Sequence, residues 1–388
     1  MAVSATPSGL PGVHAHRVIF IDLARALAVV FMLYGHAIDA LLAPMYKAGA
    51  WHSAWQFQRG LTSSLFLLLS GFAFSVATGR HWASHTTTSP AWWRRVRRFA
   101  FFVALGYALH FPAGRVFDVP YAAEPQWRSF FAVDVLQLIG VTFIGIQLLV
   151  LLVPSRRAFT IAALVIAGTL IAATPYMWSV DWARWLPRGL WAYLAPVYGP
   201  GFPLFPVFPW SAFILIGAGL GQIYARWGGA HLADFTWRAL IVPGAVLVLG
   251  GYAVAWYPHP LFSGGARGVL QVDMTIRAGA CFLILGLIAL ASDRLTRLPR
   301  VFGAVAQETL LIYFVHLCVI YGSAWSHGLL QAFGPTLDPS TTAGVVAGLI
   351  MAMVAMATSW NWVKHARPRA ALWIGRAAMA LLFGGVLF

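Results

Sequence analysis

The chain of 388 residues is strongly apolar, with 60% hydrophobic and only 10% charged residues. No soluble globular domain has this composition, whereas membrane proteins do. The 26 Lys and Arg exceed the 11 Asp and Glu, but these cations lie between apolar runs and form no single basic patch. The composition therefore predicts an integral membrane protein and excludes nucleic acid as a partner.

Eleven apolar stretches are long enough to cross the roughly 30 Å of hydrocarbon in a bilayer. In chain order they are 18–43, 60–79, 98–113, 129–153, 157–178, 206–226, 238–257, 270–291, 303–325, 341–362 and 370–388. The third is unusually rich in Phe and the last is interrupted by Arg376. The pattern predicts an all-α fold, a polytopic membrane helix bundle with about 10–11 transmembrane helices, in one domain over 1–388.

The distribution of cations predicts how the chain is oriented. Residues 1–16 contain no apolar signal-peptide core, so we expect a flexible cytoplasmic N-terminus and a first span that is retained. Lys and Arg are concentrated in the connections on the side of this N-terminus, which the positive-inside rule makes the cytoplasmic side. The aromatic segment 182–198 is expected to be an interfacial or re-entrant piece. The two cysteines fall inside apolar runs, which argues against a disulfide framework.

The first span carries four ionisable residues, which is unusual because such groups are costly inside a bilayer and are mostly functional or paired. They are Asp22, Arg25, His36 and Asp39. At 100° per residue, all four fall within an arc of about 100° on one helix face. His36 lies roughly 16 Å further along the axis than Arg25. One interpretation is a structural Asp22–Arg25 ion pair with interfacial His36 and Asp39; the other is a catalytic histidine facing an internal cavity, since its pKa suits proton transfer near neutrality.

Three later spans also contain polar pairs, and we expect them to line one cavity with the first span. They are Asp134 with Gln137, Asp273 with Arg277, and Glu308 with His316, with Tyr313 between the last two. Asp273 and Arg277 are four residues apart and are predicted to form an ion pair. Glu308 and His316 differ by about 80° on a straight helix, so they are expected to share a pocket. No spacing typical of a metal site occurs, and no metal is expected.

Several motifs resemble those of the transmembrane acyltransferase superfamily, and most closely those of bacterial relatives of heparan-α-glucosaminide N-acetyltransferase. The first is Ile-Asp-Leu-Ala-Arg at 21–25, followed after ten residues by His36. Further similar pieces are 65–72, Asp134-Val-Leu-Gln-Leu-Ile-Gly at 134–140, the Pro-Trp stretch at 205–217 and Leu-Leu-Ile-Tyr-Phe-Val-His at 310–316. These pieces extend over most of the chain in the order that the family shows.

The resemblance implies an acyl-CoA-dependent transmembrane acyltransferase, with Arg25 and His36 as the motif pair. In the lysosomal branch the catalytic histidine lies in the next loop, in a His-x-x-Trp setting, and His52 with Trp55 matches that setting. Both histidines are therefore candidate general bases toward an amine or hydroxyl of the acceptor. Asp39 is expected to orient the His36 imidazole. Substrate-binding roles are expected for Asp22, Asp134, Gln137, Trp210, Glu308, Tyr313 and His316.

The expected co-substrate is acetyl-CoA or another acyl-CoA, and its phosphates are expected at Arg94, Arg95 and Arg98, because guanidinium forks suit phosphate. The expected acceptor is a glycan or amino sugar on the far side of a bacterial inner (plasma) membrane. Membrane lipid and a second copy of the chain, giving a homodimer, are further expected partners.

Two other classes of function fit part of the pattern. A transporter or exporter would use the four ionisable residues on one face of the first span, here called the polar stripe, as a proton or substrate path. However, the sequence lacks the internal repeats that many transporters have. A scaffold has no reason to contain five carboxylates within its spans. The sequence therefore favours acyl transfer over both alternatives.

Overall fold

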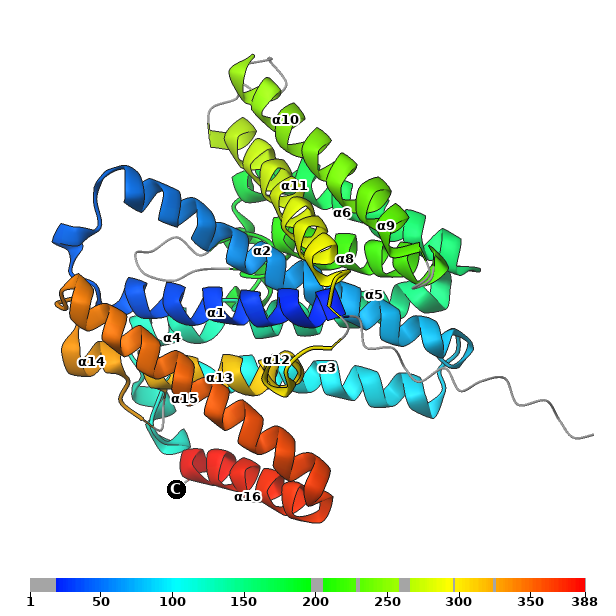
Figure 1. The fold of residues 1–388 in the computed structure, drawn as a ribbon. Helices are drawn as coiled ribbons and strands as arrows, with labels where there is room; N and C mark the ends of the chain where they lie inside the picture. The colour runs from blue at the N-terminus through cyan, green and yellow to red at the C-terminus, as the bar shows by residue number, and fades with distance from the viewer. Residues whose placement is uncertain are drawn as a thin grey trace, which may run out of the picture.

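The structure is a computed structural model that describes residues 19–196, 205–227, 231–257, 266–295, 297–323 and 326–387. The N-terminal segment 1–16, expected to be flexible and cytoplasmic, lies outside these residues. The described chain is almost entirely helical (Figure 1).

The helices follow the apolar stretches closely. Their bounds are α1 Ile19–Leu41, α2 Gly49–Arg80, α3 Pro90–Leu109, α4 Glu124–Phe131, α5 Val135–Leu152, α6 Arg156–Ser179, α7 Arg188–Trp191, α8 Val207–Trp227, α9 Leu232–Phe235, α10 Val242–Trp256, α11 Ala266–Ser292, α12 Arg300–Gln307, α13 Thr309–Tyr321, α14 Leu329–Phe333, α15 Pro339–Ala366 and α16 Pro368–Leu387. Short 3₁₀ turns are η1 Pro44–Tyr46, η2 Trp82–Ser84, η3 Val116–Tyr121 and η4 Trp182–Arg184, and a π-helical turn, η6 Thr236–Ile241, joins α9 to α10.

The predicted all-α polytopic bundle is confirmed. Eight helices in the described residues are long and apolar enough to cross a membrane, or nine if the bent pair α12–α13 counts as one span. The remaining two of the eleven predicted stretches correspond to α3 and α16, which do not meet this criterion for a membrane span. Each contains arginines that lower its mean hydropathy. Helices satisfy their backbone hydrogen bonds internally, as the hydrocarbon of a bilayer requires.

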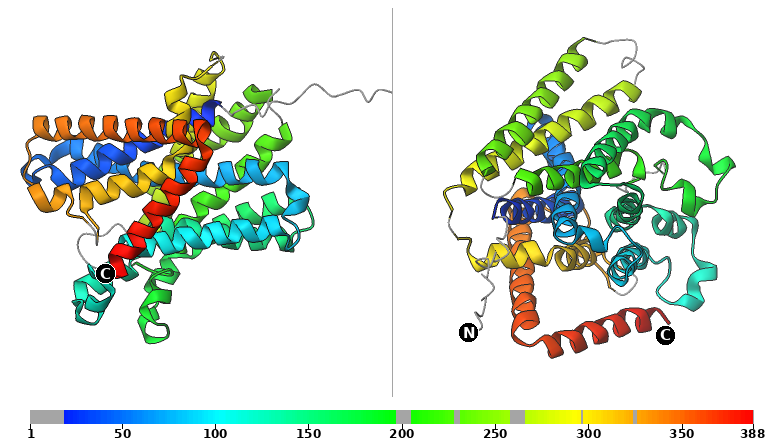
Figure 2. Two further views of the ribbon diagram at one scale, coloured as in Figure 1. Left: turned by 90° about the horizontal axis from the view of Figure 1, so that it is seen from below. Right: turned by 90° about the vertical axis from the view of Figure 1, so that its right-hand side faces the viewer.

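The helices α1 and α2 lie side by side in the middle of the bundle, and the other helices surround them (Figures 1 and 2). Ala24, Ala28 and Ala37 of α1 are fully buried, so neighbouring helices approach this helix closely. The helix α16 lies at the edge of the bundle beside α15. The side chains on the buried parts of α1 are therefore fixed by contacts with neighbouring helices.

The span predicted at 303–325 is not straight. It breaks between α12 and α13 with a bend of 74°, and Glu308 at the break has non-helical angles of φ −99° and ψ 21°. The bend redirects every side chain of α12 relative to α13. Angular spacing calculated for a continuous helix therefore does not apply across residue 308.

A buried histidine in the connection between α2 and α3 predicts that stability depends on pH. Burial and the nearby Arg95 and His81 lower the pKa of His85 from 6.5 to about 4. The unfolded chain then binds the proton more readily than the folded chain between about pH 6.5 and pH 4, so stability should fall across that window as the pH is lowered. We expect the melting temperature in detergent to drop by several degrees from pH 7 to pH 4, and less in His85→Gln.

The matched control for this prediction is His365→Gln, since His365 is exposed on α15. That variant should keep the pH dependence of the wild type. An unchanged slope in His85→Gln would show that another group causes the acid sensitivity.

Candidate active site

A large cavity of about 1470 Å³ lies where several helices end or begin on one side of the bundle. Its walls come from the C-terminal part of α1, the N-terminal half of α2, the end of α3, the starts of α5 and α8, and from α4, α11, α13 and α14. Its polar lining residues include His36, Asp39, Arg59, His110, Ser129, Asp134, Arg277, Tyr313 and Tyr321. Histidines, carboxylates and guanidiniums that are distant in the sequence are thus gathered around one space of ligand size.

His36 faces this cavity from α1 and is held in place by a residue of α13. Its Nδ1 lies 3.0 Å from the Tyr321 hydroxyl, and the two rings meet edge to face with centroids 5.6 Å apart. Tyr321 is the last residue of α13 because Gly322 follows with a φ of 78°, which favours glycine. The end of α13 therefore fixes the orientation of the imidazole.

Asp39 also lines the cavity, but the side chain that is hydrogen-bonded to His36 is Tyr321 and not this carboxylate. The Asp39 carboxylate instead forms an ion pair with Arg59 of α2. Lys47 donates a hydrogen bond of 2.8 Å to the Asp39 carbonyl oxygen. These contacts tie the end of α1 to α2 and keep the charge of Asp39 balanced.

A row of polar groups leads from His36 across α13 to α5. The rings of His36 and His316 have centroids 5.3 Å apart, and those of His316 and Tyr313 lie 5.7 Å apart. The Tyr313 hydroxyl donates to Asp134 Oδ1 at 3.0 Å. His316 is fully buried; its Nδ1 bonds to the Ile312 carbonyl, and its Nε2 has no hydrogen-bond partner among the described residues. The structure thus brings together four of the predicted site residues.

Gln137 has a local role that its position three residues after Asp134 could have indicated. Asp134 is the N-cap of α5, and Gln137 Oε1 accepts a hydrogen bond of 3.2 Å from the Asp134 backbone N–H. This capping box holds the start of the helix. Gln137 is not among the lining residues, whereas Trp210 is, and Trp210 packs edge to face on Phe205 with centroids 4.9 Å apart.

Beside Arg59 and Tyr321, the polar residues of the cavity that were not predicted from the sequence include His110 and Ser129. His110 caps the end of α3, where a histidine is most simply interpreted as interfacial, yet its Nε2 lies 3.3 Å from Asp134 Oδ2. Ser129 lies on the short helix α4, and its hydroxyl is 3.4 Å from His110 Nδ1. The only sequence signal was the order His, Ser, Asp within 25 residues flanking a turn-rich segment, which is too common to identify a site.

The predicted pair of Asp273 and Arg277 is confirmed, with Arg277 Nε 2.6 Å from Asp273 Oδ2. Arg277 lines the cavity and its guanidinium packs against Gly60 of α2, where a Cβ would overlap it. The glycine at this position therefore makes room for a cation at the cavity wall.

The other motif residues of the first spans are not among the residues that line the cavity. Arg25 donates a hydrogen bond of 3.0 Å to Thr309 Oγ1 at the start of α13, and Asp22 is buried one turn earlier on α1. His52 is half-buried on α2, stacks on Trp55 with centroids 5.6 Å apart and bonds to Gln56 at 3.1 Å. Gln56, the hydrogen-bond partner of His52, does line the cavity.

Glu308 and His316 do not share the pocket that a straight helix predicts, because the chain bends between them. Glu308 Oε1 accepts hydrogen bonds from Lys364 Nζ at 2.5 Å and from Asn361 Nδ2 at 3.0 Å, both on α15. His316 points toward His36 instead. Glu308 thus fastens the break between α12 and α13 to α15.

The arginines Arg94, Arg95 and Arg98 lie in the first half of α3, whose other end reaches the cavity at His110. Arg98 is twelve residues before His110, or about 18 Å along the axis. Arg95 bonds to the Thr78 hydroxyl and lies over the Phe74 ring. This cluster is therefore at the end of the bundle opposite the cavity.

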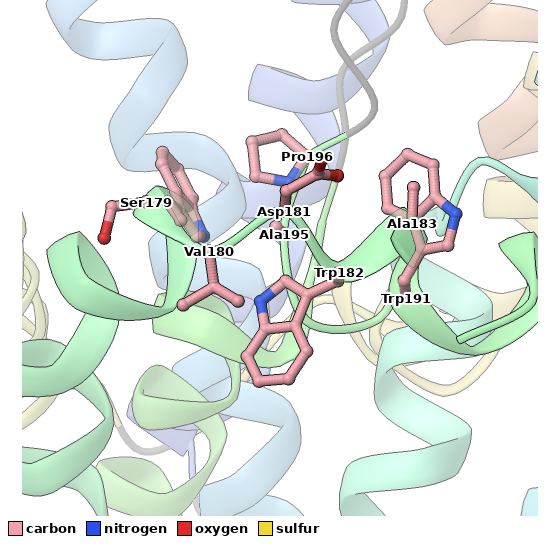
Figure 3. A pocket seen from close by; sticks show the side chains of 9 residues that line it. Ser179, Val180, Asp181, Trp182, Ala183, Trp191, Ala195 and Pro196 are labelled. Carbon is pink, nitrogen blue, oxygen red and sulfur yellow. The ribbon is translucent and has the colours of Figure 1, made fainter. Parts of the chain in front are cut away.

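A smaller cavity of about 280 Å³ lies between the end of α6 and α7 (Figure 3). Trp178, Trp182 and Trp191 contribute to its lining, and Trp182 donates its indole N–H to the Met177 carbonyl at 2.7 Å. Its one ionisable lining residue, Asp181, pairs with Arg184 at 2.8 Å. No histidine of the described residues lines this cavity, and its one carboxylate is held in an ion pair. The large cavity, whose lining includes three histidines, is therefore the candidate active site. Among the described residues, no group of three or more His, Cys, Asp or Glu is placed to hold a metal ion.

Comparison with known proteins identifies the family of the chain. A family model described as "Heparan-alpha-glucosaminide N-acetyltransferase, catalytic" matches residues 17–258, more than half of the chain. No curated protein and no solved structure matches the chain. The matched region includes α1 with His36, α2 with His52, and the residues around Asp134. This chain belongs to the heparan-α-glucosaminide N-acetyltransferase catalytic family.

Proposed function

We propose that this protein transfers an acetyl group from acetyl-CoA to an amine or hydroxyl of a sugar-like acceptor, with His36 as the general base. Membership of an N-acetyltransferase family supports a multi-pass membrane acetyltransferase. The observation that carries the assignment of His36 is its position at the wall of a 1470 Å³ cavity, with Nδ1 bound to Tyr321.

The hydrogen bond to Tyr321 suits a base. With the proton on Nδ1, the imidazole donates to the phenol oxygen, and the Nε2 lone pair is left to accept a proton from the acceptor. A positioned histidine of this kind typically contributes 10²–10⁴-fold to the rate of proton transfer. The ion pairs of Asp39 with Arg59 and of Asp273 with Arg277 supply hydrogen-bonding groups around the same space. A polar, multiply charged wall suits a hydroxyl-rich acceptor better than an apolar one.

The location of the cavity fits transfer across the membrane. Arg94, Arg95, Arg156 and Lys364 lie at helix ends that are remote from the cavity. Two of these ends are joined to the end of α2, where Arg95 bonds to the Thr78 hydroxyl and Arg156 to the Gly79 carbonyl. The positive-inside rule places that end of the bundle, and with it the N-terminus, in the cytoplasm. We propose that the acyl-CoA phosphates bind the α3 arginines there, and that the acetyl group reaches the cavity on the far side of a bacterial inner membrane.

The experiment that tests this function uses the purified full chain in detergent with acetyl-CoA and glucosamine as probes. We expect free CoA and N-acetylglucosamine to form in equal amounts, measured by a thiol reagent and by mass spectrometry. Acetyl-CoA at one hundred times its Kd should also raise the free energy of unfolding by about 2.7 kcal/mol. The control is the same chain with CoA and no acetyl group.

Two results would contradict the proposal. Neither product nor a thermal shift with acetyl-CoA would remove acyl-CoA as the donor. Uptake of glucosamine into proteoliposomes without acetylation would identify a transporter instead.

A further inference from the structure

Ser129, His110 and Asp134 form a chain of contacts along one wall of the large cavity. The Ser129 hydroxyl lies 3.4 Å from His110 Nδ1, and His110 Nε2 lies 3.3 Å from Asp134 Oδ2. All three line the cavity that His36 faces. A hydroxyl, an imidazole and a carboxylate in this order are the parts of an activated serine nucleophile, which is recognised by its geometry and not by its fold.

The carboxylate is firmly held. Asp134 is the N-cap of α5; its Oδ1 accepts from the Val135 backbone N–H at 2.6 Å and from the Tyr313 hydroxyl at 3.0 Å. Its Oδ2 is left to face His110. A carboxylate fixed by two donors can hold one tautomer of a neighbouring imidazole, as the third member of a catalytic triad does.

The serine is held by the packing of its helix. On α4, Phe130 packs on Tyr107 of α3 with ring centroids 5.1 Å apart. Glu124, at the start of α4, pairs with Arg188 of α7 at 2.8 Å. These contacts fix the helix at both ends, so the approach of Ser129 to His110 does not depend on a free loop. Distances slightly beyond the ideal are usual when no substrate is bound.

We propose that Ser129 is a catalytic nucleophile that carries the acetyl group between the two substrates, with His110 as its base and Asp134 as the positioning residue. This inference rests on the proposed function. It gives the cavity two histidines with separate tasks: His110 acts on Ser129, and His36, held by Tyr321, acts on the acceptor.

The first half-reaction transfers the acetyl group to the enzyme. Ser129 Oγ bonds to the thioester carbonyl carbon while His110 Nδ1 takes the hydroxyl proton. The C–S bond then breaks, and CoA leaves as its thiolate. The products are an acetyl ester on Ser129 and an imidazolium at His110, whose charge is stabilised by the Asp134 carboxylate.

The second half-reaction transfers the acetyl group to the acceptor. The acceptor nitrogen or oxygen bonds to the ester carbonyl carbon and gives its proton to His36 Nε2. As the ester C–O bond breaks, His110 returns its proton to Ser129 Oγ. The proton left on His36 passes through solvent to the CoA thiolate, which restores both histidines and balances the charge.

The test is to expose the full chain to acetyl-CoA without acceptor, quench it in acid and map the acetyl group by peptide mass spectrometry. We expect acetylation at Ser129 in the wild type and in His36→Ala, which should release one equivalent of CoA and then stop. Ser129→Ala should lose both the label and at least roughly a hundredfold of the transfer rate. Ser129→Cys should carry the acetyl group as a thioester, which neutral hydroxylamine removes.

The control is Ser53→Ala, an exposed serine on α2, which should behave as the wild type. Full transfer by Ser129→Ala, or an acetyl group found on a histidine, would overturn the nucleophile while leaving the proposed function intact. Wild type that binds acetyl-CoA but releases no CoA, with or without glucosamine, would overturn both.

Discussion

Replacing His36 by alanine should lower the rate of acetyl transfer to glucosamine by about 10²–10⁴-fold, the range for loss of a general base. The imidazole is the proton acceptor at the cavity wall, and alanine leaves no group at that position to replace it. Because the catalytic interaction is made in the transition state, kcat should fall while KM stays within a few fold. The measurement is product formation at saturating acetyl-CoA over a range of glucosamine concentrations.

Two further variants make this result specific. Tyr321→Phe keeps the ring contact with His36 but removes the hydroxyl 3.0 Å from Nδ1, so a smaller loss is expected, together with a shifted pH profile. His52→Ala should retain most of the activity, since His52 contacts Trp55 and Gln56 and does not line the cavity. If His36→Ala is fully active and His52→Ala is inactive, the base is His52.

The apolar pattern was sufficient to predict the fold, because each span must be a helix in hydrocarbon. It could not show that 303–325 is broken, since the partners that Glu308 finds at the break come from α15. Lys364 and Asn361 provide hydrogen bonds to this carboxylate, and these lie more than fifty residues away. Contacts this distant in the sequence cannot be inferred from the spacing of residues within one span.

The polar stripe of the first span predicted which residues of α1 face the cavity, but not which residues of other helices contact them. Angular spacing placed His36 and Asp39 on one face, and both line the cavity. The partner of His36, Tyr321, comes from a helix almost three hundred residues later. Asp39, expected at that place, is held by Arg59. This ion pair joins opposite charges on two different helices, so it cannot be predicted from the spacing of residues within α1.

His110 illustrates a different limit. At the end of a span, a histidine is usually interfacial, and its sequence neighbours do not distinguish the two cases. Only the folded chain places the N-cap of α5 beside it. Asp134 was predicted as a site residue from its position in a span, while the residues it contacts, His110 and Tyr313, come from helices before and after it.

A second large effect is expected where α2 and α8 cross. A Cβ at Gly217 would overlap the carbonyl oxygen of Leu68, and a Cβ at Gly71 would overlap that of Ile214. Small residues at such crossings let helices pack closely, which matters in a bilayer because apolar side chains alone give no net drive to associate. The two backbones here leave no room for even one methyl group.

Gly217→Ala should therefore destabilise the protein, although alanine alone favours a helix over glycine by about 1 kcal/mol. Backbone atoms must move to admit the methyl group, and overpacking of this kind costs roughly 1–3 kcal/mol or more. We expect a lower melting temperature in detergent and a smaller yield of folded protein. The controls are Gly145→Ala and Gly168→Ala, where no atom lies within 4 Å of the new Cβ. The melting temperatures of these two controls should be unchanged or slightly raised. A lower melting temperature for Gly217→Ala alone would then show that the loss comes from packing and not from helix propensity. A Gly217→Ala protein that melts with the controls would mean that α2 and α8 are not packed through this glycine.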